Sequence, residues 1–241
     1  MAGDGKIDCY FDIASLYSYL TILDLFRNRS LLNANNVQVE LHPVLLGAIN
    51  AGSGNRPPWT LPAKAKYGIF DAKRSVARFP GLQIKFPHDL MTLGHTVLPQ
   101  RSLHFIKANY PNPVYEATIL HLLRLFWSPP ENVNLTVAEN VRKALLDVQV
   151  DGEKVFDDKQ VGEILQKAGE KEWKDKLKNT TQEALDRGAF GAPWLWVTNS
   201  EGKGEPFFGS DRFAFVYKFL GVPFQDVQLL PPGGKRNGAK L

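Results

Sequence analysis

The sequence predicts an α/β fold in which two parts of one sheet are separated along the chain by a block of helices. Three observations indicate this fold: residues 6–41 read strand–helix–strand, residues 194–220 read strand–strand–helix, and helical periods fill much of the chain between them. Two or three strands rarely bury enough apolar surface to be stable alone. We therefore expect the two ends of the chain to pair into a single sheet.

The first segment predicts a βαβ unit. Residues 6–12 alternate between apolar and polar side chains, which is typical of a strand with one buried face. From Ser15 the apolar residues recur with a helical period, and we expect this helix to run to about Arg29. Residues 37–41 alternate again, and a helix of this length is the usual connection between two parallel strands.

The middle of the chain predicts one loop and several helices. Residues 47–62 are rich in glycine and proline and show almost no periodicity, so we expect a long loop there. Thr136 is expected to cap a helix, because Glu139 follows three residues later as in a capping box. The apolar periods place helices at 63–78, 114–127, 137–148, 161–168 and 173–188.

The last segment predicts a ββα unit. Residues 194–198 and 205–208 read as two short strands joined by a turn. A helix fits residues 211–220, with Ser210 or Asp211 as its cap. A βαβ unit joined to a ββα unit in one sheet is the thioredoxin-like arrangement.

On this interpretation the chain has two domains. Residues 1–48 and 189–241 form a thioredoxin-like domain, and residues 49–188 form an all-helical domain inserted into it. Three junctions then meet at one edge of the sheet: the first strand with its helix, the turn before the third strand, and the last strand with its helix. Polar residues at these junctions are the candidates for a functional site.

Composition and charge exclude several classes of function. Hydrophobic residues make up 44% and charged residues 22%, as in an ordinary globular protein, and no stretch is long and apolar enough to span a membrane. The net charge of +4 comes from basic residues scattered among acids, which argues against a nucleic-acid surface. One cysteine and five scattered histidines give neither a disulfide nor a metal-ligand spacing. We therefore expect no membrane span, no nucleic acid partner and no metal, and an intracellular compartment.

Ser15 stands at the first strand–helix junction, and Ser18 follows three residues later, where redox proteins place two cysteines. Serine is a preferred helix cap, which is one sufficient reason for its presence. The same position also suits an anion, because the first turn of a helix presents unpaired N–H groups and a partial positive charge. Ser15 could therefore hold the thiolate of a small thiol from solution. Cys9, inside the first strand, is expected to be a small buried hydrophobe.

Ala192 and Pro193 stand at the start of the third strand. A trans proline is tolerated at the mouth of a strand, where its missing N–H does no harm. In a thioredoxin-like sheet this position favours a cis proline instead, although cis bonds are uncommon elsewhere. The backbone of Ala192 would then face the site, open to a peptide-like ligand.

Two further segments carry polar residues that suit the ends of an amino acid or peptide. Ser210 and Asp211 begin a helix, and they also suit a carboxylate and an ammonium group. The loop segment 53–64 adds Asn55 and Lys64, although a lone lysine is most often only a surface residue. Three aromatic residues could line an apolar pocket, although core packing is their commoner use: Tyr17, Trp59 and Tyr67.

Four motifs occur in this order along the chain: D-I-A-S-L-Y-S-Y, S-G-N-R-P-P-W-T-L-P-A-K, R-G-A-F-G-A-P and F-F-G-S-D-R. Together they resemble the kappa class of glutathione transferases, which is similar to bacterial 2-hydroxychromene-2-carboxylate isomerases and to DsbA-type oxidoreductases. The resemblance covers nearly the whole chain. It implies a thioredoxin-like domain interrupted by a helical one, a homodimer, and a glutathione transferase with a glutathione peroxidase activity beside it.

The resemblance also implies roles for individual residues. Ser15 would hydrogen-bond the sulfur of glutathione, the co-substrate, and favour the thiolate that attacks a small electrophile or a peroxide. The backbone of Ala192 would pair with the cysteinyl part of glutathione. Asn55 and Lys64 would contact its glycyl end.

Ser210 and Asp211 would contact the γ-glutamyl group, with Asp211 reaching from its own subunit or from the second one. The sequence departs from the family pattern at two positions. Leu16 replaces the usual proline, which sets the first helical turn less rigidly. Ala192 replaces a bulkier residue, which keeps the backbone contact and changes the shape of the pocket.

The C-terminal tripeptide A-K-L resembles the S-K-L type of peroxisomal signal. Lys235 and Arg236, just before it, and peroxisomal members of the kappa class strengthen this interpretation. The sequence therefore predicts a peroxisomal protein, with mitochondria or cytoplasm as the alternative.

Two alternatives to the transferase remain open. An isomerase of the 2-hydroxychromene-2-carboxylate type would use the same glutathione site and regenerate glutathione after each turnover. A thioredoxin-fold module without enzymatic activity would not bind glutathione. A disulfide oxidoreductase is disfavoured, because Ser15 and Ser18 cannot cycle between thiol and disulfide.

Overall fold

The structure, a computed structural model, describes residues 5–130, 132–225, 227 and 229, and joins both ends of the chain in one sheet. Its four strands lie in the order β2–β1–β5–β6, and their bounds are β1 (Gly5–Phe11), β2 (Val37–Pro43), β5 (Trp194–Thr198) and β6 (Gly204–Phe208). β1 runs parallel to β2 and antiparallel to β5, and β5 runs antiparallel to β6. The expected pairing of the two ends is confirmed.

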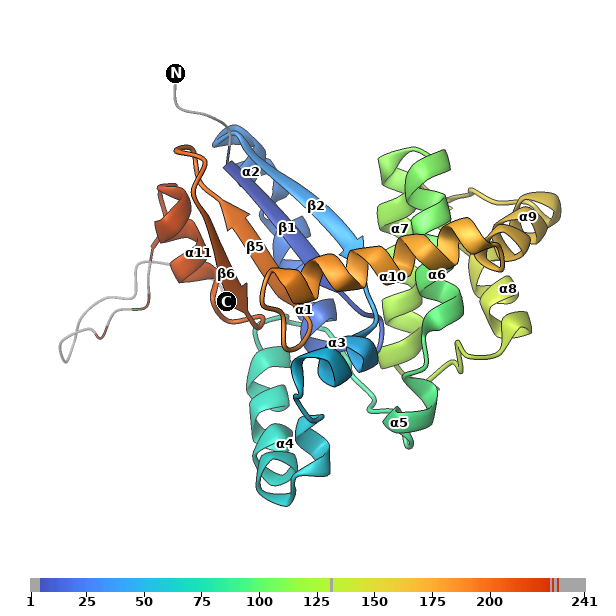
Figure 1. Ribbon diagram of the computed structural model, residues 1–241, viewed down its shortest axis with the longest axis horizontal. Helices are drawn as coiled ribbons and strands as arrows, with labels where there is room; N and C mark the ends of the chain where they lie inside the picture. The colour runs from blue at the N-terminus through green and yellow to red at the C-terminus, as the bar shows by residue number, and fades with distance from the viewer. Residues whose placement is uncertain (1–4, 131, 226, 228, 230–241) are drawn as a thin grey trace.

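Helices surround this sheet and fill most of the chain between β2 and β5 (Figure 1). In chain order they are α1 (Leu16–Arg27), α2 (Arg29–Ala34), α3 (Leu46–Ser53), the 3₁₀ turn η1 (Pro58–Thr60), α4 (Pro62–Val76), α5 (Leu90–Leu93), α6 (Val97–Asn109), α7 (Asn112–Trp127), α8 (Ala138–Leu146), α9 (Asp158–Ala168), α10 (Lys171–Asp186) and α11 (Phe213–Leu220). A short hairpin of β3 (Gln149–Val150) and β4 (Glu153–Lys154) precedes α9.

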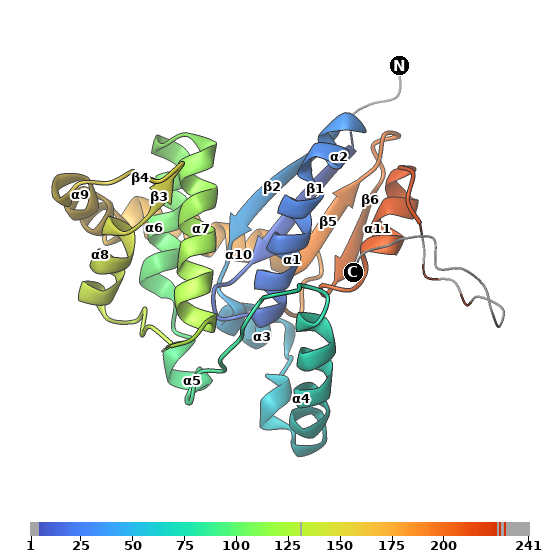
Figure 2. The same ribbon diagram turned by 180° about the vertical axis from the view of Figure 1, so that it is seen from behind.

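The alternation along β1 sends its side chains into two different layers. Ile7, Cys9 and Phe11 are fully buried in the main core, which they share with α1. Tyr10 points to the opposite face, where its hydroxyl donates to Oε1 of Glu183 on α10 at 2.7 Å. Figures 1 and 2 show the same arrangement, with α1 and α11 on one face of the sheet and α10 across the other.

Four of the helices between β2 and β5, α6 to α9, form an insertion that lies beside the sheet, whereas α10 crosses one face of the sheet (Figure 2). α6 joins this insertion to β2: Nε2 of His104 donates to the carbonyl of Pro43 at 2.9 Å, and Nζ of Lys107 pairs with Glu40 at 2.7 Å. α4 projects from the body in both views, and Ala72 is its buried residue. The division into two separate domains at residues 48 and 189 stays a prediction.

The prediction of a long loop at 47–62 is wrong, because α3 and η1 occupy most of these residues. The start of α3 depends on Asp12, a residue distant in the sequence. The carboxylate of Asp12 accepts a hydrogen bond from the N–H of Leu46 at 2.7 Å and so caps the first turn of α3. Ile49 is fully buried on the inner side of the same helix.

Two further helix ends differ from the prediction. The first helix stops at Arg27, because the side-chain amide of Asn28 donates to the carbonyl of Asp24 at 2.9 Å and α2 then starts separately. Thr136 does not cap α8, because its hydroxyl donates to Oδ1 of Asn134 at 2.6 Å.

Neither Ser210 nor Asp211 caps α11, so that prediction is also wrong. The turn after β6 opens at Gly209, whose φ of 98° favours glycine, and carries the chain past both residues before the helix starts. Arg212 occupies the cap position without a side-chain hydrogen bond to the helix.

Candidate functional site

Ser15 caps α1, as predicted, and it also faces the start of β5. Its Oγ accepts a hydrogen bond from the N–H of Ser18 at 3.1 Å and donates one to the carbonyl of Ala192 at 2.8 Å. The first turn of α1 contains no acidic residue, so the helix itself does not offset the partial positive charge at this end. Ser15 therefore lies where an anion would be stabilised, next to the backbone of Ala192.

The segment that carries Ala192 is tied to two other elements. The peptide bond between Ala192 and Pro193 is cis, which confirms that prediction. Nδ2 of Asn55 donates to the carbonyl of Phe190 at 2.7 Å, and the N–H of Gly209 donates to the carbonyl of Pro193 at 3.4 Å. The structure thus brings Asn55, from the loop after α3, to the same segment as Ser15.

Ser210 and Asp211 reach this edge through the pairing of β5 with β6. Phe208 at the end of β6 pairs with Trp194, which directly follows the cis proline. Ser210 is 2% exposed, whereas Asp211 is exposed and forms an ion pair with Arg212 at 3.0 Å. A buried hydroxyl and an exposed carboxylate therefore follow one another beside the Ala192 segment.

Lys64 lies on α4, an element that carries none of the other predicted site residues. It is exposed in the first turn of α4, about two turns before Asp71, which corresponds to roughly 10 Å along the helix. Asp71 ties α4 to α1: its Oδ2 accepts from the hydroxyl of Tyr17 at 2.5 Å, and its Oδ1 accepts from Tyr67 at 3.4 Å. Burial and the hydrogen bond to Asp71 raise the pKa of Tyr17.

The three aromatic residues that could line a pocket differ in burial. Tyr17 is half-buried and bound to Asp71, while Tyr67 is 59% and Trp59 39% exposed. Nε1 of Trp59 donates to Sδ of Met91 at 3.4 Å. Trp59 and Tyr67 therefore form part of the outer surface of η1 and α4, whereas Tyr17 on α1 packs against the main core.

Asp12 is a residue of the site that the sequence prediction does not include. It is 1% exposed, and its Oδ1 accepts from the N–H of Ala14 at 2.9 Å and from the hydroxyl of Thr96 at 2.6 Å. Its Oδ2 accepts from Leu46, and its carbonyl accepts from the N–H of Ser15 at 3.0 Å. Burial raises the pKa of Asp12, and these hydrogen bonds act in the opposite direction. An acidic residue at the end of a buried strand, just before a capping serine, is the signal that could have identified it.

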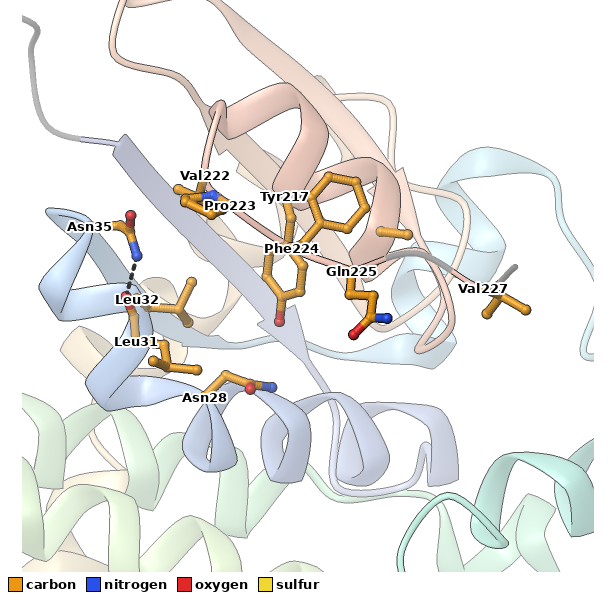
Figure 3. A pocket seen from close by; sticks show the side chains of 11 residues that line it. Asn28, Leu31, Leu32, Asn35, Tyr217, Val222, Pro223, Phe224, Gln225 and Val227 are labelled. Atoms are coloured by element: carbon orange, nitrogen blue, oxygen red, sulfur yellow. Dashed lines mark hydrogen bonds between the residues drawn. The ribbon is translucent and has the colours of Figure 1, made fainter. Parts of the chain in front are cut away.

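Two cavities lie away from the residues gathered around Ser15. One, of about 350 Å³, is at the opposite end of α1 and is lined by residues of α2, α11 and the segment after α11, including Asn28, Leu32, Tyr217 and Phe224 (Figure 3). The other, of about 500 Å³, lies between α4 and the apolar segment that follows it. Ala72 in its wall directly follows Asp71, so this second cavity adjoins the contact between α4 and α1.

Within residues 5–130, 132–225, 227 and 229, no cluster of three or more histidine, cysteine, aspartate or glutamate side chains could hold a metal ion. None of the described helices combines the length and the apolar character that crossing a membrane requires.

The fold and the sequence both match known proteins. Residues 6–221 match the DSBA-like thioredoxin domain family. The chain is also 30% identical over 230 residues to Glutathione S-transferase kappa 1 of Rattus norvegicus, a match that covers 89% of this chain and 90% of the rat protein. The chain belongs to the kappa class within the DsbA-like thioredoxin family.

Other comparisons agree with this membership. Glutathione S-transferase kappa 1 of Caenorhabditis elegans is 29% identical over 231 residues, which cover 90% of this chain and 92% of the nematode protein. The solved structure of a 2-hydroxychromene-2-carboxylate isomerase superposes with a TM-score of 0.67 at 17% identity, over 90% of this chain and 94% of that one. At that identity the isomerase shows the fold alone.

This kappa-class member has a single cysteine and cannot form a disulfide within one chain. Ser15 and Ser18 occupy the positions where two cysteines would stand, and Cys9 is fully buried in β1. Burial raises the pKa of the Cys9 thiol. The prediction that Cys9 is a buried hydrophobe is confirmed, and the end of α1 carries a hydroxyl in place of a thiol.

Proposed function

We propose that this protein is a glutathione transferase of the kappa type, in which Ser15 holds the sulfur of bound glutathione as a thiolate. The observation that carries the proposal is the place of the Ser15 hydroxyl: it is buried at the positive end of α1, 2.8 Å from the carbonyl of Ala192. Kappa-class names of the sequence relatives support glutathione as co-substrate.

The energy required is within the reach of this geometry. A free thiol titrates near pH ~8.5, so only a few per cent is thiolate at pH 7. Lowering the pKa by about one unit needs about 1.4 kcal/mol of preference for the anion. One charge-assisted hydrogen bond and a helix end supply that much together. The thiolate then attacks an electrophilic carbon, forming a C–S bond as the leaving group departs with its electron pair. With a peroxide, it forms an S–O bond to one oxygen as the O–O bond breaks, and the other oxygen leaves with the electron pair and takes up a proton.

Binding requires an exchange of partners at Ser15. A hydroxyl carries one hydrogen, and in the free protein it is donated to the carbonyl of Ala192. Ser15 can donate to the sulfur only after releasing that carbonyl. The cysteinyl N–H of glutathione can then take the released carbonyl, so that no buried acceptor stays unpaired.

The test is the Ser15→Ala variant. We expect the ultraviolet absorbance of bound glutathione thiolate to fall at pH 7 and the titration midpoint of the bound thiol to rise by about one unit. Ser102→Ala is the matched control, because Ser102 is equally buried but donates to the carbonyl of Leu98 in its own helix. An unchanged midpoint in Ser15→Ala would remove Ser15 from the mechanism.

The isomerase alternative predicts a different stoichiometry from the same site. A transferase consumes one glutathione for each electrophile, whereas an isomerase leaves the amount of glutathione unchanged. A binding module without activity would also leave the amount of glutathione unchanged, but it would convert no substrate. Quantifying both free glutathione and the remaining substrate through a complete reaction therefore separates these functions, and we expect glutathione to be consumed.

The assembly and location of the protein are also proposals. We expect a homodimer, which light scattering of the purified protein would show. Asn55, Ser210 and Asp211 would contact glutathione within it, and Lys64 would meet the ligand only if the ligand or a second subunit reaches α4. The A-K-L signal lies outside the described residues, and deleting it from a fluorescent fusion should abolish peroxisomal import.

A further inference from the structure

We propose that Asp12 is the positioning residue of the glutathione site: its buried carboxylate fixes the Ser15 turn against α3 and the helical insertion. The proposal rests on the function proposed above, and it assigns a role that the sequence motifs do not indicate. Asp12 would act through Ser15, without touching glutathione.

The contacts of Asp12 join three separate parts of the chain. On its own turn, the carboxylate accepts from the N–H of Ala14 at 2.9 Å, and the carbonyl accepts from the N–H of Ser15 at 3.0 Å. From the start of α3 it accepts the N–H of Leu46 at 2.7 Å. From the start of α6 it accepts the hydroxyl of Thr96 at 2.6 Å.

The three donors leave little freedom for the Ser15 turn. Asp12 is 1% exposed and Thr96 fully buried, so water cannot replace a lost partner without rearrangement. Oγ of Ser18 also lies 3.4 Å from the N–H of Asp12, which links the first turn of α1 to the same residue. A shift of the carboxylate therefore moves the end of α1 that carries Ser15.

An amide at this position cannot make the same set of hydrogen bonds. In Asp12→Asn, either orientation of the side chain turns its NH₂ group toward a backbone N–H, that of Ala14 or that of Leu46. One hydrogen bond is lost in both cases, although the size of the side chain is unchanged. Thr96→Val removes a single donor and leaves the carboxylate in place.

The titration of bound glutathione separates positioning from charge. If Asp12 acts by placing Ser15, Asp12→Asn raises the midpoint of the bound thiol, because the hydroxyl no longer meets the sulfur. If Asp12 acted only as a nearby negative charge, its removal would lower the midpoint. We expect a raised midpoint and a loss of about tenfold or more in kcat/KM, as small misplacements of reacting groups commonly produce.

Thr96→Val keeps the test decisive if Asp12→Asn does not fold, and it should shift the midpoint in the same direction by a smaller amount. Thr118→Val is the matched control, since the equally buried Thr118 donates to the carbonyl of Val114 within its own helix, α7. Unchanged or lowered midpoints in folded Asp12→Asn and Thr96→Val would overturn this inference and leave the proposed function intact. If the wild-type protein itself formed no glutathione thiolate, the proposed function would fail and the inference with it.

Discussion

Gly191 shows how closely the site is packed at the level of single residues. A Cβ atom at this position would lie 2.8 Å from Cε2 of Phe208, closer than real contacts allow. The ring of Phe208 also packs against that of Phe190 with centroids 4.5 Å apart, so both exposed rings would have to shift. A larger residue before Ala192 therefore displaces the rings that flank the Ala192 segment.

We expect Gly191→Ala to lower the free energy of unfolding by about 1–3 kcal/mol, as overpacking does elsewhere, and to weaken glutathione binding because Ala192 shifts with it. Urea unfolding and calorimetric titration measure the two effects. Gly47→Ala is the control, since a Cβ atom at Gly47 would have no neighbour within 4 Å, and it should stabilise α3 by a few tenths to about 1 kcal/mol. Wild-type stability and binding in Gly191→Ala would show that Phe208 adapts.

The residues of the site differ in how far the sequence could identify them. Ser15, Ala192 and the residues after β6 were accessible, because a thioredoxin-like topology places strand–helix junctions at one edge. Asp71 was not, because its contact with Tyr17 depends on how α4 crosses α1, which no local pattern encodes.

At the level of elements, α4 depends on few contacts. Ala72 is its buried residue, and the carboxylate of Asp71 links it to Tyr17 on α1. Tyr17→Phe should therefore speed hydrogen exchange in α4 and cost about 1–2 kcal/mol of stability. The midpoint of bound glutathione should stay unchanged, because Ser15 keeps its own partners.

Tyr115→Phe provides a comparison, because it removes a buried tyrosine hydroxyl that donates to the carbonyl of Leu41 at 2.9 Å, away from α4. Its hydrogen exchange in α4 should match that of the wild type. Equal exchange in Tyr17→Phe would mean that other contacts hold α4 in place.

Two helices that the sequence failed to predict, α3 and α6, depend on contacts with distant segments of the chain. α3 is capped by the distant Asp12, so its own residues carry no start signal. α6 and the β3–β4 hairpin were absent from the prediction. In α6 polar side chains such as Gln100 are buried and bind backbone carbonyls of other segments, which hides the apolar period. Strands β1 and β5, with regular alternation or a compact apolar run, were predicted to within a residue or two.

At the level of the whole molecule, His104 connects the helical insertion to the sheet. Its Nε2 donates to the carbonyl of Pro43, and burial lowers the pKa of His104 to about 4. The unfolded chain would bind a proton at this residue near pH ~6.5, whereas the folded chain would not do so until about pH 4. Stability from this group is therefore present above pH ~6.5 and is lost as the pH falls toward 4.

The loss from this one group should reach roughly 3 kcal/mol at pH 4. We expect His104→Gln, which keeps an N–H donor, to be less stable than the wild type at pH 7 but to lose less on acidification across this window. The difference between the two curves of unfolding free energy against pH isolates His104 from other titrating groups. Parallel curves would show that His104 does not contribute to the loss of stability at low pH.

The bond between Ser15 and the carbonyl of Ala192 has a consequence for which thiols the protein would accept. A visiting thiol that carries no amide next to its sulfur can engage Ser15 only by stranding that carbonyl, at a cost of about 1–3 kcal/mol. A peptide thiol brings the replacement donor with it. The empty site would thus discriminate against simple mercaptans before any contact with the two ends of glutathione is made.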